Sequence, residues 1–153
     1  MRKVFLLILC LSLFASCGSR VVEPSTEDDG TQLTYWENGR LKSESHYVDG
    51  KLNGSFKTWY ENGQVFQDGL YVDDMMDGSW LIFYPDGSLA ARAQYEKGSG
   101  KQTCYNNEGC IIMEVEYVDN LKHGREIHYA TNGSVLQVVN YERGKKVEEH
   151  EMP

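Results

Sequence analysis

Beyond about residue 32, apolar and polar side chains alternate in short rows, and each row begins two residues after a glycine. The rows open on the aliphatic residues Leu41, Val65, Leu89, Ile111 and Val135. Six residues later they close on Tyr47, Tyr71, Tyr95, Tyr117 and Tyr141. The interleaved positions are on average more polar. Alternation with period two predicts β-strands that have one buried face and one solvated face.

The rows are joined by glycine turns that recur at a nearly constant spacing. The turn pairs end at Gly39, Gly63, Gly87, Gly109 and Gly133, which are 24, 24, 22 and 24 residues apart. A second turn phrase follows each row, in the forms YVDGKLNG, YVDDMMDG, YEKGSG, YVDNLKHG and YERGKKVE. Asn-Gly and Asp-Gly favour tight hairpin turns, so each repeat supplies two turns and two strands. We therefore expect an all-β fold, an elongated single-sheet meander of about five β-hairpin repeats of 22–24 residues.

These repeats resemble the MORN repeat in its bacterial variant, whose units read like YxDGKxxGxWxxYYxNGxL. The matching residues are Tyr47, Asp49, Gly50, Lys51, Gly54, Trp59, Tyr60, Asn62, Gly63 and Val65. The resemblance covers about residues 35–147 and implies a twisted solenoid of consecutive hairpins, so the repeat domain is expected at 32–147. The charged residues near the C-terminus discourage further strand pairing and predict a charged tail at 148–153. Some relatives carry an antitoxin-like label, so a toxin-neutralising or immunity partner is the alternative function.

The N-terminus has the order of a secretory signal, in which Arg2 and Lys3 precede an apolar run at residues 4–14. That run is well short of the ~20 residues that span a bilayer as a helix. The stretch LFASC that ends at Cys17 resembles the lipobox of bacterial lipoproteins, although Phe14 departs from the usual aliphatic residue. The resemblance implies a signal peptide at 1–16 and an acylated, palmitate-bearing Cys17. The alternative is an ordinary secreted protein in which Cys17 is a thiol.

Residues 17–31 are polar and acidic, which is typical of a flexible tether. Gly18 follows the cysteine where an inner-membrane lipoprotein typically has Asp, so the lipoprotein resemblance favours the outer membrane or another part of the cell envelope. Of the 15 basic residues, 13 remain without Arg2 and Lys3, against 23 acidic ones. No basic cluster is visible, so we expect no nucleic-acid partner.

The third repeat loses residues from its turn and places Cys104 and Cys110 on either side of a YNNEG turn. An oxidising compartment favours a disulfide across this hairpin. The alternative is that both residues are small hydrophobic side chains in the sheet, since facing positions are required for a disulfide.

No catalytic or metal motif appears, so we expect a protein that is not an enzyme and has no cofactor and no metal. The three acids Asp73, Asp74 and Asp77 crowd one turn, and turn chemistry explains them. Large aromatic side chains dominate recognition surfaces, and the candidate contacts are Trp36, Trp59, Trp80 and Phe83. The alternative is that these side chains only stiffen the sheet. The expected function is a lipid-anchored envelope module that binds or scaffolds a protein or glycan partner.

Overall fold

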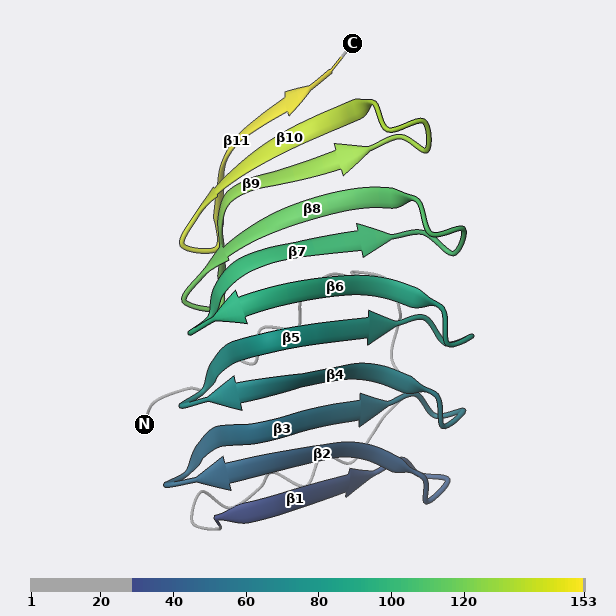
Figure 1. Cartoon of the computed structure of the whole chain (residues 1–153), viewed down its shortest axis with the longest axis vertical. Helices are drawn as coiled ribbons and strands as arrows, with labels where there is room; N and C mark the ends of the chain where they lie inside the picture. The colour runs from purple at the N-terminus through teal and green to yellow at the C-terminus, as the bar shows by residue number, and fades with distance from the viewer. Residues whose placement is uncertain (1–28, 153) are drawn as a thin grey trace.

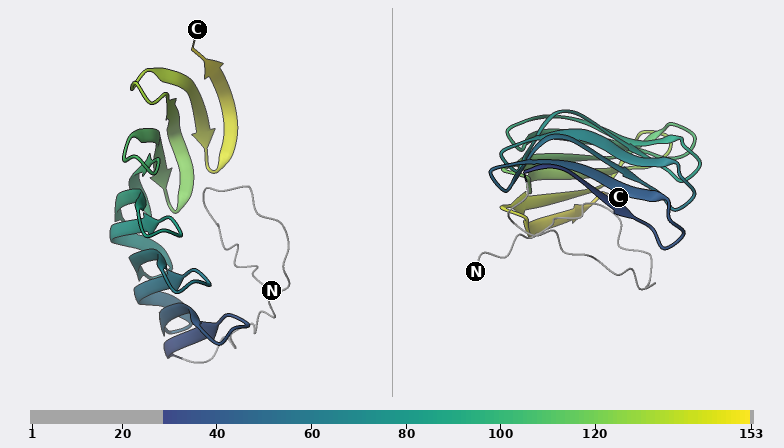
Figure 2. Two further views of the ribbon diagram at one scale, coloured as in Figure 1. Left: turned by 90° about the vertical axis from the view of Figure 1, so that its right-hand side faces the viewer. Right: turned by 90° about the horizontal axis from the view of Figure 1, so that it is seen from below.

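The computed structural model describes residues 29–152, which form a single antiparallel sheet of 11 strands in sequence order (Figure 1). The strands are β1 (Gly30–Tyr35), β2 (Leu41–Val48), β3 (Lys51–Trp59), β4 (Val65–Val72), β5 (Met75–Phe83), β6 (Leu89–Glu96), β7 (Ser99–Tyr105), β8 (Ile111–Val118), β9 (Leu121–Tyr129), β10 (Val135–Glu142) and β11 (Lys145–Glu151). The sheet is curved along the stacking direction, and its C-terminal strands bend toward one side (Figure 2). The predicted all-β meander of hairpin repeats is confirmed. No apolar helix of membrane-spanning length occurs among residues 29–152.

The two edges of the sheet use different turns. At the edge formed by the Asn-Gly pairs, only the glycine has a positive φ, such as +81° at Gly39. Gly39 donates its backbone N–H to the Trp36 carbonyl at 2.9 Å, and Trp36 donates to Arg40 at 2.8 Å. This is a three-residue loop that closes on the pair Trp36 and Arg40. A separate bulge follows in the ladder, where the register shift between Thr34 and Tyr35 leaves Lys42 of β2 as the extra residue.

The opposite edge uses two-residue turns in which both central residues have positive φ, as at Asp49 (52°) and Gly50 (70°). This is the type I′ geometry that matches the right-handed twist of paired strands. In two turns the second glycine is replaced, by Asp74 (φ 68°) and by Asn120 (φ 62°). Asp74 Oδ1 accepts the Leu52 N–H at 2.8 Å, and Asn120 Oδ1 accepts the Met76 N–H at 2.9 Å. These side chains therefore tie each turn to the turn of an earlier repeat.

The core lies on one side of the sheet, which we call the core face. Its buried residues include Trp80, Tyr95, Val115 and Tyr117, and Phe56, Tyr71, Met76, Ala93 and Met113 pack against them. Val115 is fully buried and Tyr117 is 2% exposed. These side chains contact one another across strands, because a single sheet has no second layer to cover them.

Trp80 fills a position where the neighbouring strand has no side chain. A Cβ atom added to Gly69 would lie 2.2 Å from the Trp80 ring, so only glycine fits beneath the indole. The Trp80 indole N–H donates to the Leu70 carbonyl at 3.1 Å. The ring also meets Tyr71 edge-to-face, with centroids 5.0 Å apart, and lies 6.0 Å from Phe56. Trp80 thus joins β3, β4 and β5 into one packed unit.

The shortened third repeat has a structural cause. Most strand pairs contain a register shift, whereas β6 and β7 pair without one from Ala91↔Cys104 to Glu96↔Ser99. Strand β7 has 7 residues, compared with 9 in β3, β5 and β9. The 22-residue spacing therefore corresponds to a repeat that lacks one bulge.

The boundaries of the sheet differ from those predicted. Strand β1 begins at Gly30, inside the expected tether at 17–31, and β11 extends to Glu151, through most of the expected tail at 148–153. The tail prediction was wrong because charge alone does not prevent pairing. Asn140 donates to Glu148 at 3.1 Å and Gln137 to Glu149 at 2.8 Å. The predicted signal peptide, Cys17 and most of the tether lie outside the described residues.

Candidate binding surface

Aromatic side chains end every odd-numbered strand from β1 to β9 and form what we call the aromatic column: Tyr35, Trp59, Phe83, Tyr105 and Tyr129. Alternation places the members on β3, β5, β7 and β9 on the side of the sheet opposite the core face, because each lies an odd number of residues from a residue of its strand that is buried or packs in the core. On β3, for example, Phe56 packs in the core and Trp59 is three residues later.

Polar residues of the even strands accompany the aromatic column. They occupy the fifth position after each turn glycine: Glu44, Asp68, Arg92 and Glu114, with Val138 in the last repeat. The Arg92 guanidinium lies 5.8 Å from the Tyr105 ring centre. The Tyr129 hydroxyl donates to Glu114 Oε2 at 2.8 Å. The opposite face therefore presents aromatic rings beside charged groups.

The predicted contact Trp80 belongs to the core instead. It is 5% exposed and points to the core face, so its assignment to a binding surface was wrong. The physical reason is the period of two: Trp80 and Phe83 are three residues apart on β5, and their side chains therefore point to opposite sides.

Trp36 is the first of a set of aromatic residues that link neighbouring repeats at the turn edge. Its indole N–H donates to the Trp59 carbonyl at 3.1 Å. At the equivalent positions, the Tyr60 hydroxyl donates to Phe83 at 2.8 Å and the Tyr84 hydroxyl to Tyr105 at 2.7 Å. Of the four predicted contacts, only Trp59 and Phe83 thus belong to the aromatic column.

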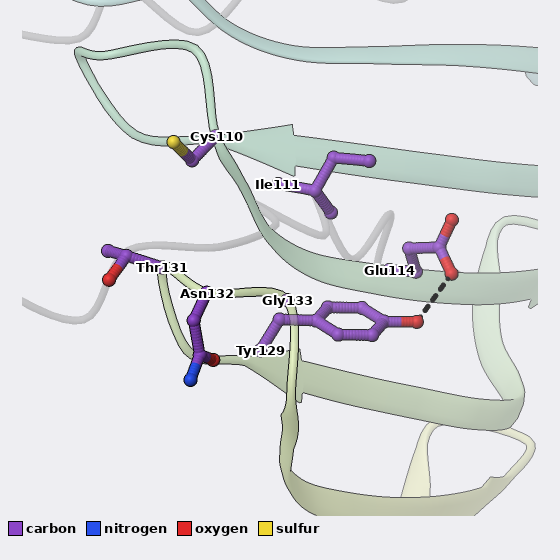
Figure 3. A pocket seen from close by; sticks show the side chains of 7 residues that line it. All are labelled: Cys110, Ile111, Glu114, Tyr129, Thr131, Asn132 and Gly133. Atoms are coloured by element: carbon purple, nitrogen blue, oxygen red, sulfur yellow. Dashed lines mark hydrogen bonds between the residues drawn. The ribbon is translucent and has the colours of Figure 1, made fainter.

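A shallow pocket of about 470 Å³ lies at the C-terminal end of the aromatic column, and Figure 3 shows its lining. The lining residues are Cys110, Ile111, Glu114, Tyr129, Thr131, Asn132 and Gly133. They come from β8, β9 and the two adjoining turns. The pocket thus combines an aromatic ring, an aliphatic side chain, a carboxylate, a hydroxyl and an amide.

Electrostatic contacts hold Glu114 ionised in this pocket. Its carboxylate accepts a hydrogen bond from Lys101 at 2.8 Å, which lowers the pKa of Glu114 against the opposing effect of burial. The hydrogen bond from the Tyr129 hydroxyl lowers that pKa further. The pKa of Tyr129 is raised, first by burial and then by the neighbouring carboxylate. At neutral pH the pair therefore consists of a carboxylate and a protonated phenol.

The predicted disulfide between Cys104 and Cys110 is not formed, and both residues are thiols within the described part of the chain. Cys104 is buried and faces Ala91 and Met113 in the ladder. Cys110 lies beyond the strand end, where its backbone N–H and carbonyl both bond to Asn106. The two residues flank a three-residue loop with a bulge and do not occupy facing positions.

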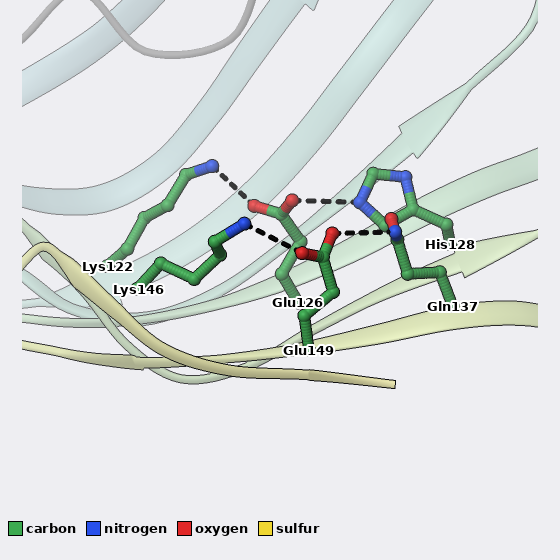
Figure 4. Close-up of polar contacts among 6 residues, drawn as sticks. All are labelled: Lys122, Glu126, His128, Gln137, Lys146 and Glu149. Atoms are coloured by element: carbon green, nitrogen blue, oxygen red, sulfur yellow. Dashed lines mark hydrogen bonds and ion pairs between the residues drawn. The ribbon is translucent and has the colours of Figure 1, made fainter. Parts of the chain in front are cut away.

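A charged cluster replaces the aromatic core near the C-terminus, and Figure 4 shows its contacts. Glu126 is 6% exposed and lies between Val115 and Val139 in the ladder. It accepts hydrogen bonds from Lys122 and from His128, the latter at 2.8 Å. Burial has the largest single effect and raises the pKa of Glu126, but the hydrogen bonds and the electrostatic attraction from Lys122 and His128 together outweigh it, and the net pKa is lowered. On β11, Glu149 accepts from Lys146 and Gln137.

These features define a β-hairpin repeat protein built as one open sheet. The family model described as MORN repeat variant matches residues 28–49, 52–73, 76–97 and 122–143, which together are more than half of the chain. The chain therefore belongs to the MORN repeat variant family. No curated protein was found to match its sequence. The unmatched stretch between the third and fourth matches contains the β7–β8 hairpin, the repeat that follows the missing bulge.

The pocket at Tyr129 was missed because the sequence repeats conceal it. Tyr129 occupies the same position as Trp59 and Phe83, and its partner Glu114 occupies the same position as Glu44 and Asp68. The available signal was the fifth position after each turn glycine, which is acidic in three of five repeats.

Proposed function

We propose that this protein is a non-catalytic binding module that recognises an extended partner in the cell envelope through its aromatic column. The main support is that an aromatic ring recurs at the end of five strands, on the side of the sheet that does not form the core. The ring is exposed in β1 and half-buried in β3, β5, β7 and β9. Rings held by a rigid sheet lose little conformational entropy when they bind, which makes them effective contacts.

The fold is compatible with such a role because the hydrophobic core of the sheet does not include the aromatic column. The core face contains the buried residues Trp80, Val115 and Tyr117, whereas the opposite face is crossed by solvent-exposed ion pairs such as Lys57 with Asp68 at 2.8 Å. Exposed ion pairs contribute little to stability, so the residues of this face can vary without loss of the fold. A surface with that freedom is suited to partner selection.

Binding of the full-length protein to separated envelope protein and envelope polysaccharide fractions tests this proposal. Trp59→Ala and Phe83→Ala should each weaken binding to the fraction that the wild type binds by roughly tenfold, the effect of losing about 1.4 kcal/mol. Val118→Ala is the matched control, since Val118 is a 41% exposed hydrophobic residue at the end of β8 and lies at the other edge of the sheet from the column. Wild-type binding by both column variants, or an equal loss in the control, would refute the proposal.

We further propose that the module is held at a membrane by a lipid on Cys17. The support is the lipobox-like stretch LFASC and the polar residues that separate it from β1. Two or more acyl chains suffice for stable attachment. Metabolic labelling with an alkyne fatty acid should label the wild type and not Cys17→Ser, with Cys110→Ser as the control. Equal labelling of the wild type and Cys17→Ser would exclude this anchor.

A further inference from the structure

We propose that the pocket at Tyr129 and Glu114 is a sugar-binding subsite, and that the partner of the aromatic column is a neutral, extended, β-linked glycan. This inference rests on the proposed binding function and specifies its ligand.

The pocket has the chemistry that a sugar ring requires. A pyranose has an apolar face of C–H groups, which stacks on an aromatic ring, and an edge of hydroxyl groups that both donate and accept hydrogen bonds. Tyr129 supplies the ring and Ile111 an aliphatic contact, and Glu114 and Thr131 supply polar groups (Figure 3). The volume of about 470 Å³ is sufficient for one or two sugar rings.

Two polar groups of the pocket retain hydrogen-bonding capacity. Glu114 accepts from Lys101 through Oε1 and from Tyr129 through Oε2, and a carboxylate has about four acceptor positions in all. Asn132 uses its Oδ1 for the Ser134 N–H and hydroxyl. In earlier repeats the corresponding amide donates to the next turn, as Asn62 does to Pro85 at 2.8 Å. No such turn follows Asn132 in the described chain, because β11 ends the sheet.

The column extends the pocket into a linear site. Phe83, Tyr105 and Tyr129 end strands that are two apart, so their spacing is roughly 9.6 Å. In an extended β-1,4-linked glycan successive sugars turn over, and the same ring face returns once per disaccharide, a length close to this spacing. The ligand and the sheet therefore share a repeat, and each added disaccharide reaches another ring.

Charge and hydrogen-bond donors distinguish a neutral glycan from two alternative ligands, an anionic polysaccharide and a proline-rich peptide. The net charge of −8 disfavours an anionic polysaccharide. A proline-rich peptide has a similar repeat, but it has no backbone N–H at proline and offers few donors to a carboxylate. Sugar hydroxyls supply donors at every residue. The acceptor-rich pocket therefore favours a neutral glycan.

Titration calorimetry and NMR with the full-length protein test the inference, with chitohexaose and cellohexaose as β-linked probes and maltohexaose as an α-linked control. A β-linked hexaose should bind at least tenfold more tightly than its disaccharide and than maltohexaose. Tyr129→Ala should weaken binding at least tenfold, whereas Tyr129→Phe, which keeps the ring, should weaken it less than threefold. Val118→Ala should bind like the wild type.

The outcomes distinguish the two proposals. If no β-linked hexaose binds while Trp59→Ala still loses binding to an envelope fraction, the glycan inference is wrong and the binding function stands. Binding of a proline-rich decapeptide without glycan binding would lead to the same conclusion. Glycan binding that is unchanged in Tyr129→Ala would overturn the subsite. Wild-type binding of both the glycan and the envelope fraction by every column variant would overturn both proposals.

Discussion

Both faces of this sheet carry aromatic side chains, but the two sets have different surroundings. On the core face, Trp80 and Tyr95 are buried and make ring contacts across strands, as Tyr95 does with Tyr117 at 5.8 Å. On the opposite face, Trp59, Phe83 and Tyr129 are half-buried and lie beside charged residues. A repeat protein with one sheet must obtain its core from one face, which leaves the aromatic residues of the other face available for recognition.

Replacing Trp80 should produce the largest loss of stability. Trp80→Ala removes the indole that covers Gly69 and contacts Phe56 and Tyr71, and buried Trp→Ala changes typically lower the free energy of unfolding by about 3–5 kcal/mol. Urea unfolding monitored by circular dichroism measures the change. Trp59→Ala is the control from the opposite face, and an equal loss in both variants would remove the distinction between the faces.

Gly69→Ala tests the same contact from the other strand. The new methyl group would lie 2.2 Å from the Trp80 ring, and overpacking of this kind lowers stability by about 1–3 kcal/mol. In a Trp80→Ala background the same substitution should have almost no effect, because the indole ring that would clash with the new methyl group is absent. A loss that persists in the double variant would mean that the backbone, and not the indole, requires glycine.

Glu126 should make the core face sensitive to acid. Its pKa is lowered in the folded protein, so its contribution to stability is complete above the unfolded value of about 4.3 and is lost as pH falls through the lower folded value. Glu126→Gln should lower the free energy of unfolding at pH 7 by about 1–3 kcal/mol. It should also make the free energy of unfolding depend less on pH below pH 5. Urea titrations at several pH values from 3 to 7 measure the free energy of unfolding, and Glu142→Gln, at an exposed position, is the control. A wild-type pH profile in Glu126→Gln would contradict this role.

Tyr60→Phe should have the smallest effect. It removes the hydroxyl that donates to the Phe83 carbonyl at 2.8 Å, a contribution of about 0.5–1.5 kcal/mol. Tyr35→Phe is the matched control, since Tyr35 is 57% exposed at the edge of the sheet. Thermal unfolding should show a lower midpoint for Tyr60→Phe alone. Identical midpoints would mean that the hydroxyl link between repeats is energetically neutral.

The sequence predicted the fold well because hairpin repeats are encoded locally. Turn glycines such as Gly39 and the closing tyrosines specify both the strand direction and the buried side. The bulges were not visible, since the two extra residues of each such bulge leave no compositional mark, and the missing bulge between β6 and β7 appeared only as a 22-residue spacing. Cys104 and Cys110 do not face each other because the three-residue loop closes between Asn106 and Cys110, which leaves Cys104 opposite Met113.

The candidate site was predicted only in part. Aromatic content alone indicates Trp59, Trp80 and Phe83 equally, whereas Trp80 lies three residues before Phe83 on β5 and therefore points to the core face. Tyr129 and Glu114 required the structure, since their hydrogen bond joins residues 15 apart in two strands. Pairing across strands depends on register, which a single sequence does not state directly.

The most direct test of the division between the two faces is ¹⁹F NMR of the protein labelled with 5-fluorotryptophan, which reports on Trp36, Trp59 and Trp80 separately. Single Trp→Phe variants assign the three signals. We predict that Trp80 shows almost no shift between H₂O and D₂O and none on adding the envelope fraction that the protein binds, while Trp59 shifts in both experiments. A Trp80 signal that responds to solvent and to the envelope fraction, with a silent Trp59, would contradict the assignment of the two faces.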